Sequence, residues 1–187
     1  MYTKCTSQRA ADQQRLFEQV MLDMLKDQLF EDISISELCR RAGLSRKTFY
    51  RLYEAKADVI YAMIDHAVME AECFVPDASV GPGEMHCFLA YWKSRKEFLD
   101  VMKSNRISSL LSQQAVLHVM REAPEIVRCL GAEDSVHGRQ CLIFYVTGLF
   151  SLVLDWHDRD FADSIDEMAA MLMRLMTTPP VKYPLEV

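Results

Sequence analysis

The fold of the N-terminal part of this chain is decided by residues 34–56, SISELCRRAGLSRKTFYRLYEAK. Ser34 and Glu37 have the spacing of a capping box, in which each side chain satisfies a backbone N–H of the other residue, and they predict the start of a short helix. Gly43 predicts the left-handed backbone that ends a helix, and Ser45 is a good N-cap for a second short helix. Two short helices joined by a three-residue turn must cross steeply, as in a helix-turn-helix.

The apolar positions of this segment match that geometry. The first helix should run to about Arg41 and the second to about Tyr53. The residue four positions before the turn glycine lies against the second helix and must be small, and Cys39 is small. The other residues expected to face the core of a small bundle are all apolar: Leu38, Ala42, Leu44, Phe49 and Leu52.

The charge of the chain is distributed unevenly. All 187 residues together have a formal net charge of −6, whereas residues 40–56 contain six Lys or Arg and one Glu, a local net charge of +5. An acidic protein with one compact basic segment is typical of a polyanion contact that is confined to that segment. A basic helix face that is simply solvated is the alternative explanation.

The side chains that should point outward from the second helix suit DNA. Arg and Lys donate to guanine O6 and N7, Thr contacts a thymine methyl group or a phosphate, and Tyr donates to phosphate. Such a helix fits the major groove with its N-terminal residues nearest the base edges. Lys56 is placed to reach a backbone phosphate from the start of the next helix. The candidate DNA-binding residues are Ser34, Ser45, Arg46, Lys47, Thr48, Tyr50, Arg51 and Lys56.

This segment resembles the DNA-binding signature of the TetR family of bacterial transcription regulators. The resemblance covers about residues 8–65 and rests on Ala42-Gly43-Leu44-Ser45, on Thr48-Phe49-Tyr50, and on Tyr53 followed three residues later by Lys56. The chain departs from the family pattern in having Leu52 for a common Tyr or His, Tyr53 for Phe, and Arg46-Lys47 for a frequent Lys-Gly pair. The ring at position 53 is kept, whereas Leu52 removes one donor to phosphate.

The resemblance implies a homodimer whose two recognition helices enter successive major grooves of a near-palindromic double-stranded DNA operator, roughly 34–36 Å apart. It also implies a cytoplasmic protein that most often represses transcription and binds an unidentified small-molecule effector through its C-terminal domain. The effector would shift the long helix 57–74 and favour a state that does not bind DNA. This requires that the effector has different affinities for the two states.

Helical periodicity extends through the rest of the chain. It predicts helices over 8–28, 57–74, 84–95, 96–105, 107–121 and 135–157, and a last one through residue 176 after a second capping box at Ser164. A loop over 76–84, a break at Pro124 and a tail over 178–187 separate or follow them.

A hydrophobic content of 50% excludes a disordered chain. Because helical periodicity dominates and no strand-like alternation occurs, we predict an all-α chain. Residues 1–56 form a three-helix DNA-binding domain with a helix-turn-helix. A long helix joins it to a helical ligand-binding and dimerisation domain over residues 57–187.

The predicted helix 135–157 is the most apolar of the chain. A helix that is apolar on all sides needs two partners to bury it, and a second subunit could supply one of them. Gly148 and Ser151 would permit close approach of another helix. The alternative is the central helix of a monomeric bundle. A membrane span needs about 20 residues, and this apolar run is shorter and interrupted, so no membrane contact is expected.

The effector pocket is predicted least sharply. Aromatic and Met-rich linings suit apolar ligands, although the same residues at helical spacing also suit a plain core. The candidate ligand-binding residues are Tyr91, Trp92, Met102, Ile107, Leu110, Leu117, Phe144 and Tyr145.

No motif of an enzyme is found. The sequence has no P-loop, no G-x-S-x-G, no HExxH and no glycine-rich dinucleotide turn, and no set of residues suits a metal ion. We therefore expect no catalysis, cofactor or metal. Two alternatives stay open: an all-α ligand-binding or enzyme module whose basic hairpin is incidental, and a DNA-binding regulator without a small-molecule effector.

Overall fold

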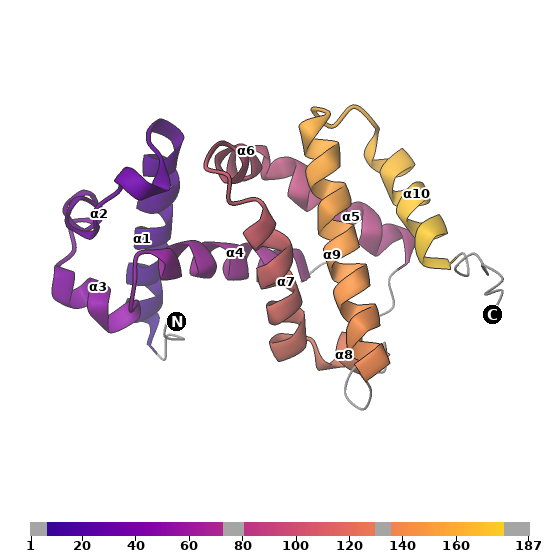
Figure 1. Cartoon of the computed structure of the whole chain (residues 1–187), viewed down its shortest axis with the longest axis horizontal. Coiled ribbons are helices and arrows are strands. Elements are labelled where there is room, and N and C mark those ends of the chain that lie inside the picture. The colour runs from indigo at the N-terminus through magenta and orange to yellow at the C-terminus, as the bar shows by residue number, and fades with distance from the viewer. Residues whose placement is uncertain (1–6, 73–80, 130–135, 178–187) are drawn as a thin grey trace, which may run out of the picture.

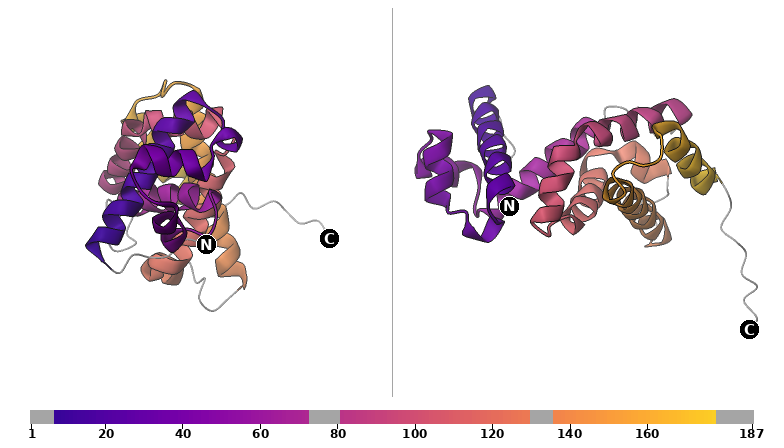
Figure 2. Two further views of the ribbon diagram at one scale, coloured as in Figure 1. Left: turned by 90° about the vertical axis from the view of Figure 1, so that its left-hand side faces the viewer. Right: turned by 90° about the horizontal axis from the view of Figure 1, so that it is seen from above.

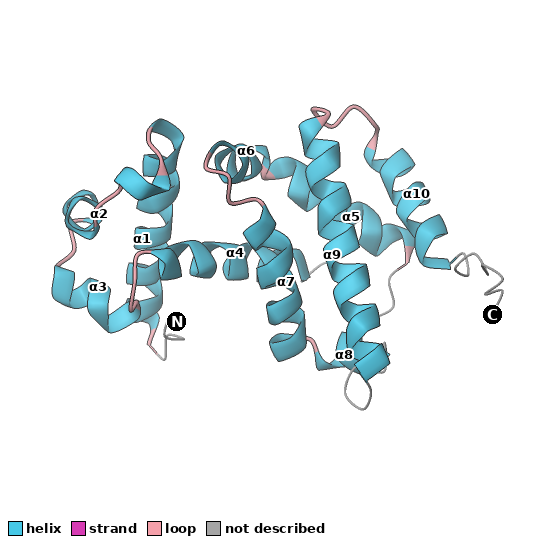
Figure 3. Ribbon diagram, viewed as in Figure 1, coloured by secondary structure: helices cyan, strands magenta, loops and turns pink. Residues whose placement is uncertain are grey.

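The computed structural model describes residues 7–72, 81–129 and 136–177, and in these ranges the chain forms helices and turns without a strand (Figure 3). The all-α prediction is confirmed. The elements in chain order are α1 Gln8–Asp27, the single 3-10 turn η1 Phe30–Asp32, α2 Ile35–Ala42, α3 Arg46–Leu52, α4 Ala57–Glu72, α5 Pro82–Ser94, α6 Lys96–Ser104, α7 Ser109–Glu122, α8 Pro124–Cys129, α9 Val136–Asp158 and α10 Ile165–Thr177.

The helices form two lobes that share α4. Figures 1 and 2 show α1 to α3 at one end of the molecule and α5 to α10 at the other, with α4 running between them. We call α1 to α3 the N-terminal lobe and α5 to α10 the C-terminal lobe. In the C-terminal lobe, α10 packs on α5, and α7 packs on both α4 and α9.

The N-terminal lobe has a core in which aromatic rings meet edge to face. Phe17 of α1 lies 5.5 Å from Phe49 of α3 and 6.0 Å from Tyr53, centroid to centroid, and all three side chains are almost completely buried. The Tyr53 hydroxyl donates to the Gln14 carbonyl oxygen on α1. Edge-to-face pairs add to the stabilisation from burial, so this cluster makes a rigid base for α3.

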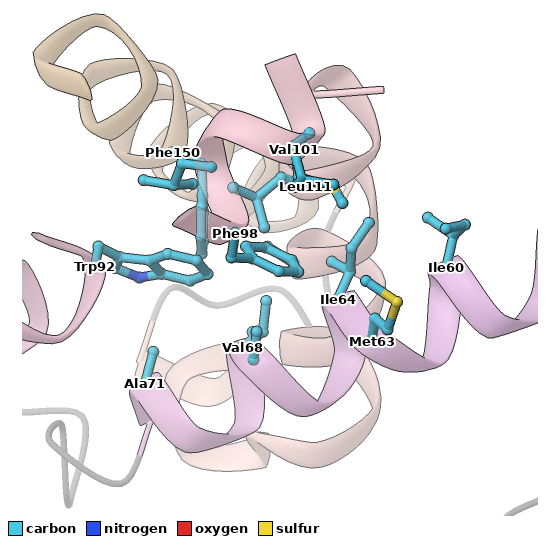
Figure 4. Packing of buried hydrophobic residues seen from close by; sticks show 14 of the residues in the cluster. Ile60, Met63, Ile64, Val68, Ala71, Trp92, Phe98, Val101, Leu111 and Phe150 are labelled. Atoms are coloured by element: carbon cyan, nitrogen blue, oxygen red, sulfur yellow. The ribbon is translucent and has the colours of Figure 1, made fainter. Parts of the chain in front are cut away.

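One face of α4 lies in the core of the C-terminal lobe. Figure 4 shows Ile64, Val68 and Ala71 along α4, opposite Trp92 of α5 and Phe98 of α6. Each of these side chains is almost completely buried. This burial fixes the position of α4 in the C-terminal lobe, and α4 also packs against α1.

Buried polar pairs also hold α4. His66 Nδ1 is 2.9 Å from Glu18 Oε2 on α1, and Asp65 Oδ1 is 2.8 Å from His118 Nδ1 on α7. Arg121 of α7 donates to the same Asp65 oxygen at 2.8 Å. Because buried charged groups are costly unless paired, these contacts set the rotation of α4 between its two neighbours.

Some helix boundaries differ from the sequence prediction. The chain was expected to remain a loop through residue 84, but α5 starts at Pro82, where the missing N–H of proline costs nothing. Pro124 does not merely break the pattern, because it occupies the first turn of the short helix α8. The rest of the expected loop, residues 76–80, and the expected tail 178–187 lie outside the described residues.

The buried side of α9 follows a four-residue step, which leads from Leu142 through Val146 to Phe150. Tyr145, one of the candidate ligand-binding residues, lies off this row and is exposed. α9 is long and apolar enough to cross a membrane, but the core helices of soluble proteins often have the same length and composition. Of its most apolar 18 residues, 28% are buried in the structure.

Candidate nucleic-acid interface

The turn between α2 and α3 has the geometry that the sequence predicts. Ser34 Oγ accepts a hydrogen bond from the Glu37 N–H at 3.1 Å, and Ser45 Oγ accepts one from the Thr48 N–H at 3.1 Å. Gly43 has φ = 62°, in the left-handed region, and ends α2. Each short helix thus begins with a satisfied cap and the first ends on a glycine, so their steep crossing is set by local interactions.

The two faces of α3 differ sharply. Phe49 and Leu52 are buried, and the Phe49 ring contacts Phe17 of α1, whereas Tyr50 is 51% exposed. The expected DNA-binding residues of α3 lie together on the outer side or at the start of the helix: Ser45, Arg46, Lys47, Thr48, Tyr50 and Arg51. This set presents hydrogen-bond donors to solvent on a helix whose other side is anchored.

The cations of α3 are available for an anionic partner. Within the described part of the chain, Arg46, Lys47 and Arg51 have no carboxylate partner. The Arg46 guanidinium lies 5.9 Å from the centre of the Tyr50 ring, and Arg51 Nη2 donates to Gln13 Oε1 on α1 at 2.6 Å. These contacts orient the two arginines without neutralising them.

The two arginines of α2, Arg40 and Arg41, share the carboxylate of Glu37, which offsets one of their two charges. The Glu37 carboxylate accepts from Arg40 at 2.6 and 2.8 Å and from Arg41 at 2.9 Å. These hydrogen bonds, Arg40 first, lower the pKa of Glu37 to about 2. The predicted capping box at Ser34 is therefore only half formed, because the Glu37 side chain turns to the arginines and not back to the Ser34 N–H. The positive charge for a partner is concentrated on α3.

Lys56 occupies a different environment from the one expected. Its ammonium donates to the carbonyl oxygens of Phe30 at 2.5 Å, Ile33 at 2.6 Å and Glu31 at 3.2 Å, and it lies 4.3 Å from the centre of the Phe30 ring. Burial lowers the pKa of Lys56. Three carbonyls match the three protons of an ammonium. In this structure Lys56 holds the η1 turn, and sequence spacing could not show this because the partners lie more than twenty residues away.

The expected ligand-binding residues do not surround one cavity. Trp92 and Met102 are completely buried in the core of the C-terminal lobe, whereas Leu117 and Phe144 are 49% and 73% exposed. Tyr91 is half-buried and donates to Glu70 Oε2. The other three candidate ligand-binding residues are also divided between core and surface: Ile107 and Leu110 pack on the core, and Tyr145 is exposed.

An open groove of about 450 Å³ lies on the outer face of α9. Of the residues proposed for the ligand only Phe144 lines it, and Gly148 has open space where a Cβ would be. Gln140 is not among the candidate ligand-binding residues, although a helical spacing of three and four residues connects the whole lining: Gln140, Ile143, Phe144, Thr147, Gly148 and Ser151. Among the described residues, no group of three or more His, Cys, Asp or Glu could hold a metal ion.

Known proteins resemble this chain in two ways. No protein-family model matches the sequence. The HTH-type transcriptional regulator EthR of Mycobacterium tuberculosis is 31% identical over 62 residues, which are 33% of this chain and 29% of EthR, and EthR of Mycobacterium bovis is equally similar. The match thus spans less than a third of these curated relatives.

The fold resembles that of a solved structure over most of the chain. A TetR-family transcriptional regulator from Streptomyces coelicolor superposes with a TM-score of 0.51 over 88% of this chain and 78% of that chain, at 18% identity. At this identity the likeness shows the fold. The described chain therefore has the fold of a TetR-family transcriptional regulator, and a third of its sequence is similar to the transcriptional regulator EthR.

Proposed function

We propose that the protein is a sequence-specific DNA-binding regulator of transcription, without catalytic activity, that acts in the bacterial cytoplasm. The observation that carries the proposal is the outer face of α3, where Arg46 and Lys47 have no carboxylate partner in the described part of the chain and lie beside Tyr50. The N-terminal end of α3 reads base edges in the major groove, with Arg46 or Lys47 donating to guanine. Thr48, Tyr50 and the caps Ser34 and Ser45 face the phosphates.

The outer face of α9 supports a homodimer. Phe144 is 73% exposed and Ile143 is 41% exposed, on either side of the space above Gly148. A contiguous apolar groove of this kind on a helix is typical of a protein interface. Two copies related by a two-fold axis would bury the same face of α9 on each other and present two α3 helices to the half-sites of a near-palindromic operator.

The third part of the proposal is that a small molecule releases the protein from its operator. Such release implies that the DNA-bound protein represses transcription. Trp92 is completely buried among aromatic side chains, and its Nε1–H has no hydrogen-bond partner among the described residues. A buried donor without a partner costs about 1–3 kcal/mol. An apolar effector with a hydrogen-bond acceptor that reaches Trp92 would relieve this cost and would favour a rearranged C-terminal lobe.

A regulator without an effector is a second candidate, and one observation favours it. The residues proposed to line the pocket are divided between a closed core, which contains Trp92 and Met102, and the surface, which carries Leu117, Phe144 and Tyr145. If the C-terminal lobe only dimerises, DNA affinity should not respond to any member of a broad panel of apolar compounds. A compound that releases DNA from the wild type, and releases it less from Trp92→Phe, would contradict this second candidate.

In-vitro selection from random double-stranded DNA tests the central proposal. The wild type should enrich a two-fold-symmetric site, and Tyr50→Ala should lose the enrichment while keeping the wild-type thermal unfolding, since Tyr50 is exposed. Arg9→Ala, an exposed arginine on α1, is the matched control and should select the same site. A folded wild-type dimer that enriches no sequence at low salt would rule out specific DNA binding, and α3 would then be a solvated basic face.

A further inference from the structure

The side chain of Asn105 connects the two lobes. It lies at the end of α6, and its Oδ1 accepts a hydrogen bond from the Phe30 backbone N–H at 2.9 Å. Its Nδ2 donates to the Leu25 carbonyl oxygen at 3.0 Å. One amide thus holds the end of α1 and the start of η1, which lie 80 and 75 residues away in the chain.

The position of Asn105 is fixed on the side of α6. The Ile107 N–H donates to the Met102 carbonyl at 2.9 Å across Arg106, whose φ of 57° is left-handed, so the helix ends in a defined turn. Asn105 Nδ2 also donates to the Val101 carbonyl at 3.1 Å. Because Met102 and Val101 are buried in the C-terminal lobe, the Asn105 amide moves with that lobe.

The other side of the same turn leads directly to the helix-turn-helix. The Phe30 residue whose N–H binds Asn105 offers its carbonyl oxygen to Lys56 at 2.5 Å, and Lys56 also binds the Ile33 carbonyl. Ser34, the N-cap of α2, follows Ile33, and α4 begins directly after Lys56. The η1 turn is therefore held by α6 on one side and by the start of α4 on the other.

An ion pair also connects α1 and α6, but it is weaker. Lys26 on α1 and Glu97 on α6 form an ion pair at 2.8 Å, but the Glu97 side chain is 70% exposed. An exposed pair of this kind contributes little and is screened by salt. The two directional hydrogen bonds of Asn105 to backbone groups are better suited to define an angle between the lobes.

We propose that Asn105 is the residue that positions the N-terminal lobe relative to the C-terminal lobe, and that it passes a rearrangement of α6 through η1 to α2 and α3. The proposal rests on the proposed function, since the orientation of α3 matters for regulation only if α3 binds DNA. Asn105 touches neither DNA nor effector. It sets the spacing at which two α3 helices of a dimer meet successive major grooves.

The first experiment requires no DNA. Residual dipolar couplings are measured on the full-length dimer for amides of residues 8–52 and 109–158, in the wild type, Asn105→Ala, Asn105→Asp and Ser104→Ala. Ser104→Ala removes a hydrogen bond of 3.3 Å that Asn105 Nδ2 donates to the neighbouring Ser104 hydroxyl, but it keeps both bonds to the N-terminal lobe. The wild type and Ser104→Ala should therefore fit one alignment tensor. Asn105→Ala should need two alignment tensors, one for each lobe. Asn105→Asp keeps the acceptor for the Phe30 N–H, so its two lobes should differ in alignment less than those of Asn105→Ala and more than those of the wild type. This variant tests the proposal if the alanine variant does not fold.

The second experiment uses the operator selected by the wild type and a copy with one base pair inserted between its half-sites. Asn105→Ala should lower the ratio of the two affinities roughly tenfold, the size expected for the loss of two hydrogen bonds. Ser104→Ala should leave the ratio unchanged. If Asn105→Ala and Asn105→Asp fit one tensor as the wild type does, the proposal is wrong. If the wild type selects no operator, the proposed function fails, and the dipolar couplings still decide whether Asn105 joins the lobes.

Discussion

The outer faces of α3 and α9 are both left uncovered by the rest of the described chain, but they differ in chemistry. The α3 face carries Arg46, Lys47 and Tyr50 above a buried aromatic base. The α9 face carries Phe144 and Ile143 beside a groove and has no charged side chain between residues 140 and 151. Exposure of a helix face therefore does not by itself indicate which kind of molecule binds there. Cations without carboxylates favour a polyanion, and apolar side chains around a glycine favour a second protein surface.

The largest effect is expected from the buried side of α3. Phe49→Ala removes a completely buried ring that contacts Phe17 and Tyr53, and large-to-small changes of this kind cost about 3–5 kcal/mol. Thermal or denaturant unfolding of the full chain measures this loss. Tyr50→Ala on the exposed side should change stability by less than about 0.5 kcal/mol. Equal losses for the two variants would show that the two faces of α3 do not differ as described.

The next largest effect is expected on the outer face of α9. Phe144→Ala should weaken the dimer by about 2 kcal/mol or more if the ring lies at the centre of the interface. Sedimentation equilibrium measures the change, and Gly148→Leu should act in the same direction, because the isolated chain has room for the added side chain. Leu29→Ala, another exposed apolar residue, is the control. A dimer that is unaffected by both α9 variants would remove this face as the interface.

Arg46 and Arg40 form a matched pair for DNA binding. Both are exposed, but the Arg40 guanidinium is held by the Glu37 carboxylate and Arg46 has no such partner in the described residues. Arg46→Ala should cost about 1–3 kcal/mol of binding to the selected operator and relax the preference at one base pair. Arg40→Ala should cost less and leave the preference unchanged. Binding isotherms on the operator and on its single-base variants decide between these outcomes.

Alanine variants of Lys56 and Lys47 distinguish a lysine that stabilises the fold from a lysine that contacts phosphate. Lys56→Ala leaves the carbonyls of Phe30 and Ile33 without their donor, so it should lower the free energy of unfolding by about 1–3 kcal/mol. Lys47→Ala should leave stability unchanged and reduce the salt slope of DNA binding by about one. The sequence predicted the phosphate role for Lys56. A folded Lys56→Ala variant of wild-type stability with a reduced salt slope would restore that role.

The smallest effect is a pH dependence confined to the N-terminal lobe. Hydrogen bonds from Arg40 and Arg41 lower the pKa of Glu37 to about 2 from 4.5, so the contribution of this pair is complete above pH 4.5 and is lost as the pH falls toward 2. Titration of the Glu37 carboxyl carbon by NMR measures the shift, and Glu37→Gln should remove the corresponding part of the stability profile. The self-association through α9 should not change between pH 4.5 and 7, because residues 140–151 contain no Asp, Glu, His, Lys or Arg.

The sequence by itself determined the helix-turn-helix and the all-α fold. The caps at Ser34 and Ser45 and the turn at Gly43 act between residues at most four positions apart, and helical periodicity connects neighbouring turns. Such interactions are present in any fold that contains the segment, so they can be read without knowing the rest. The outward and inward residues of α3 follow from the same short period.

Only the tertiary structure decided what the longer side chains contact. Lys56 was expected at a phosphate and lies on the η1 carbonyls, Leu117 was expected at a pocket and is 49% exposed, and Asn105 joins two lobes without any sequence pattern that marks it. Their partners lie 23 to 80 residues away or on the far side of a helix. The physical reason is that such contacts depend on where helix ends meet in space, which is set by the packing of α1, α4 and α6 as a whole and not by any local spacing.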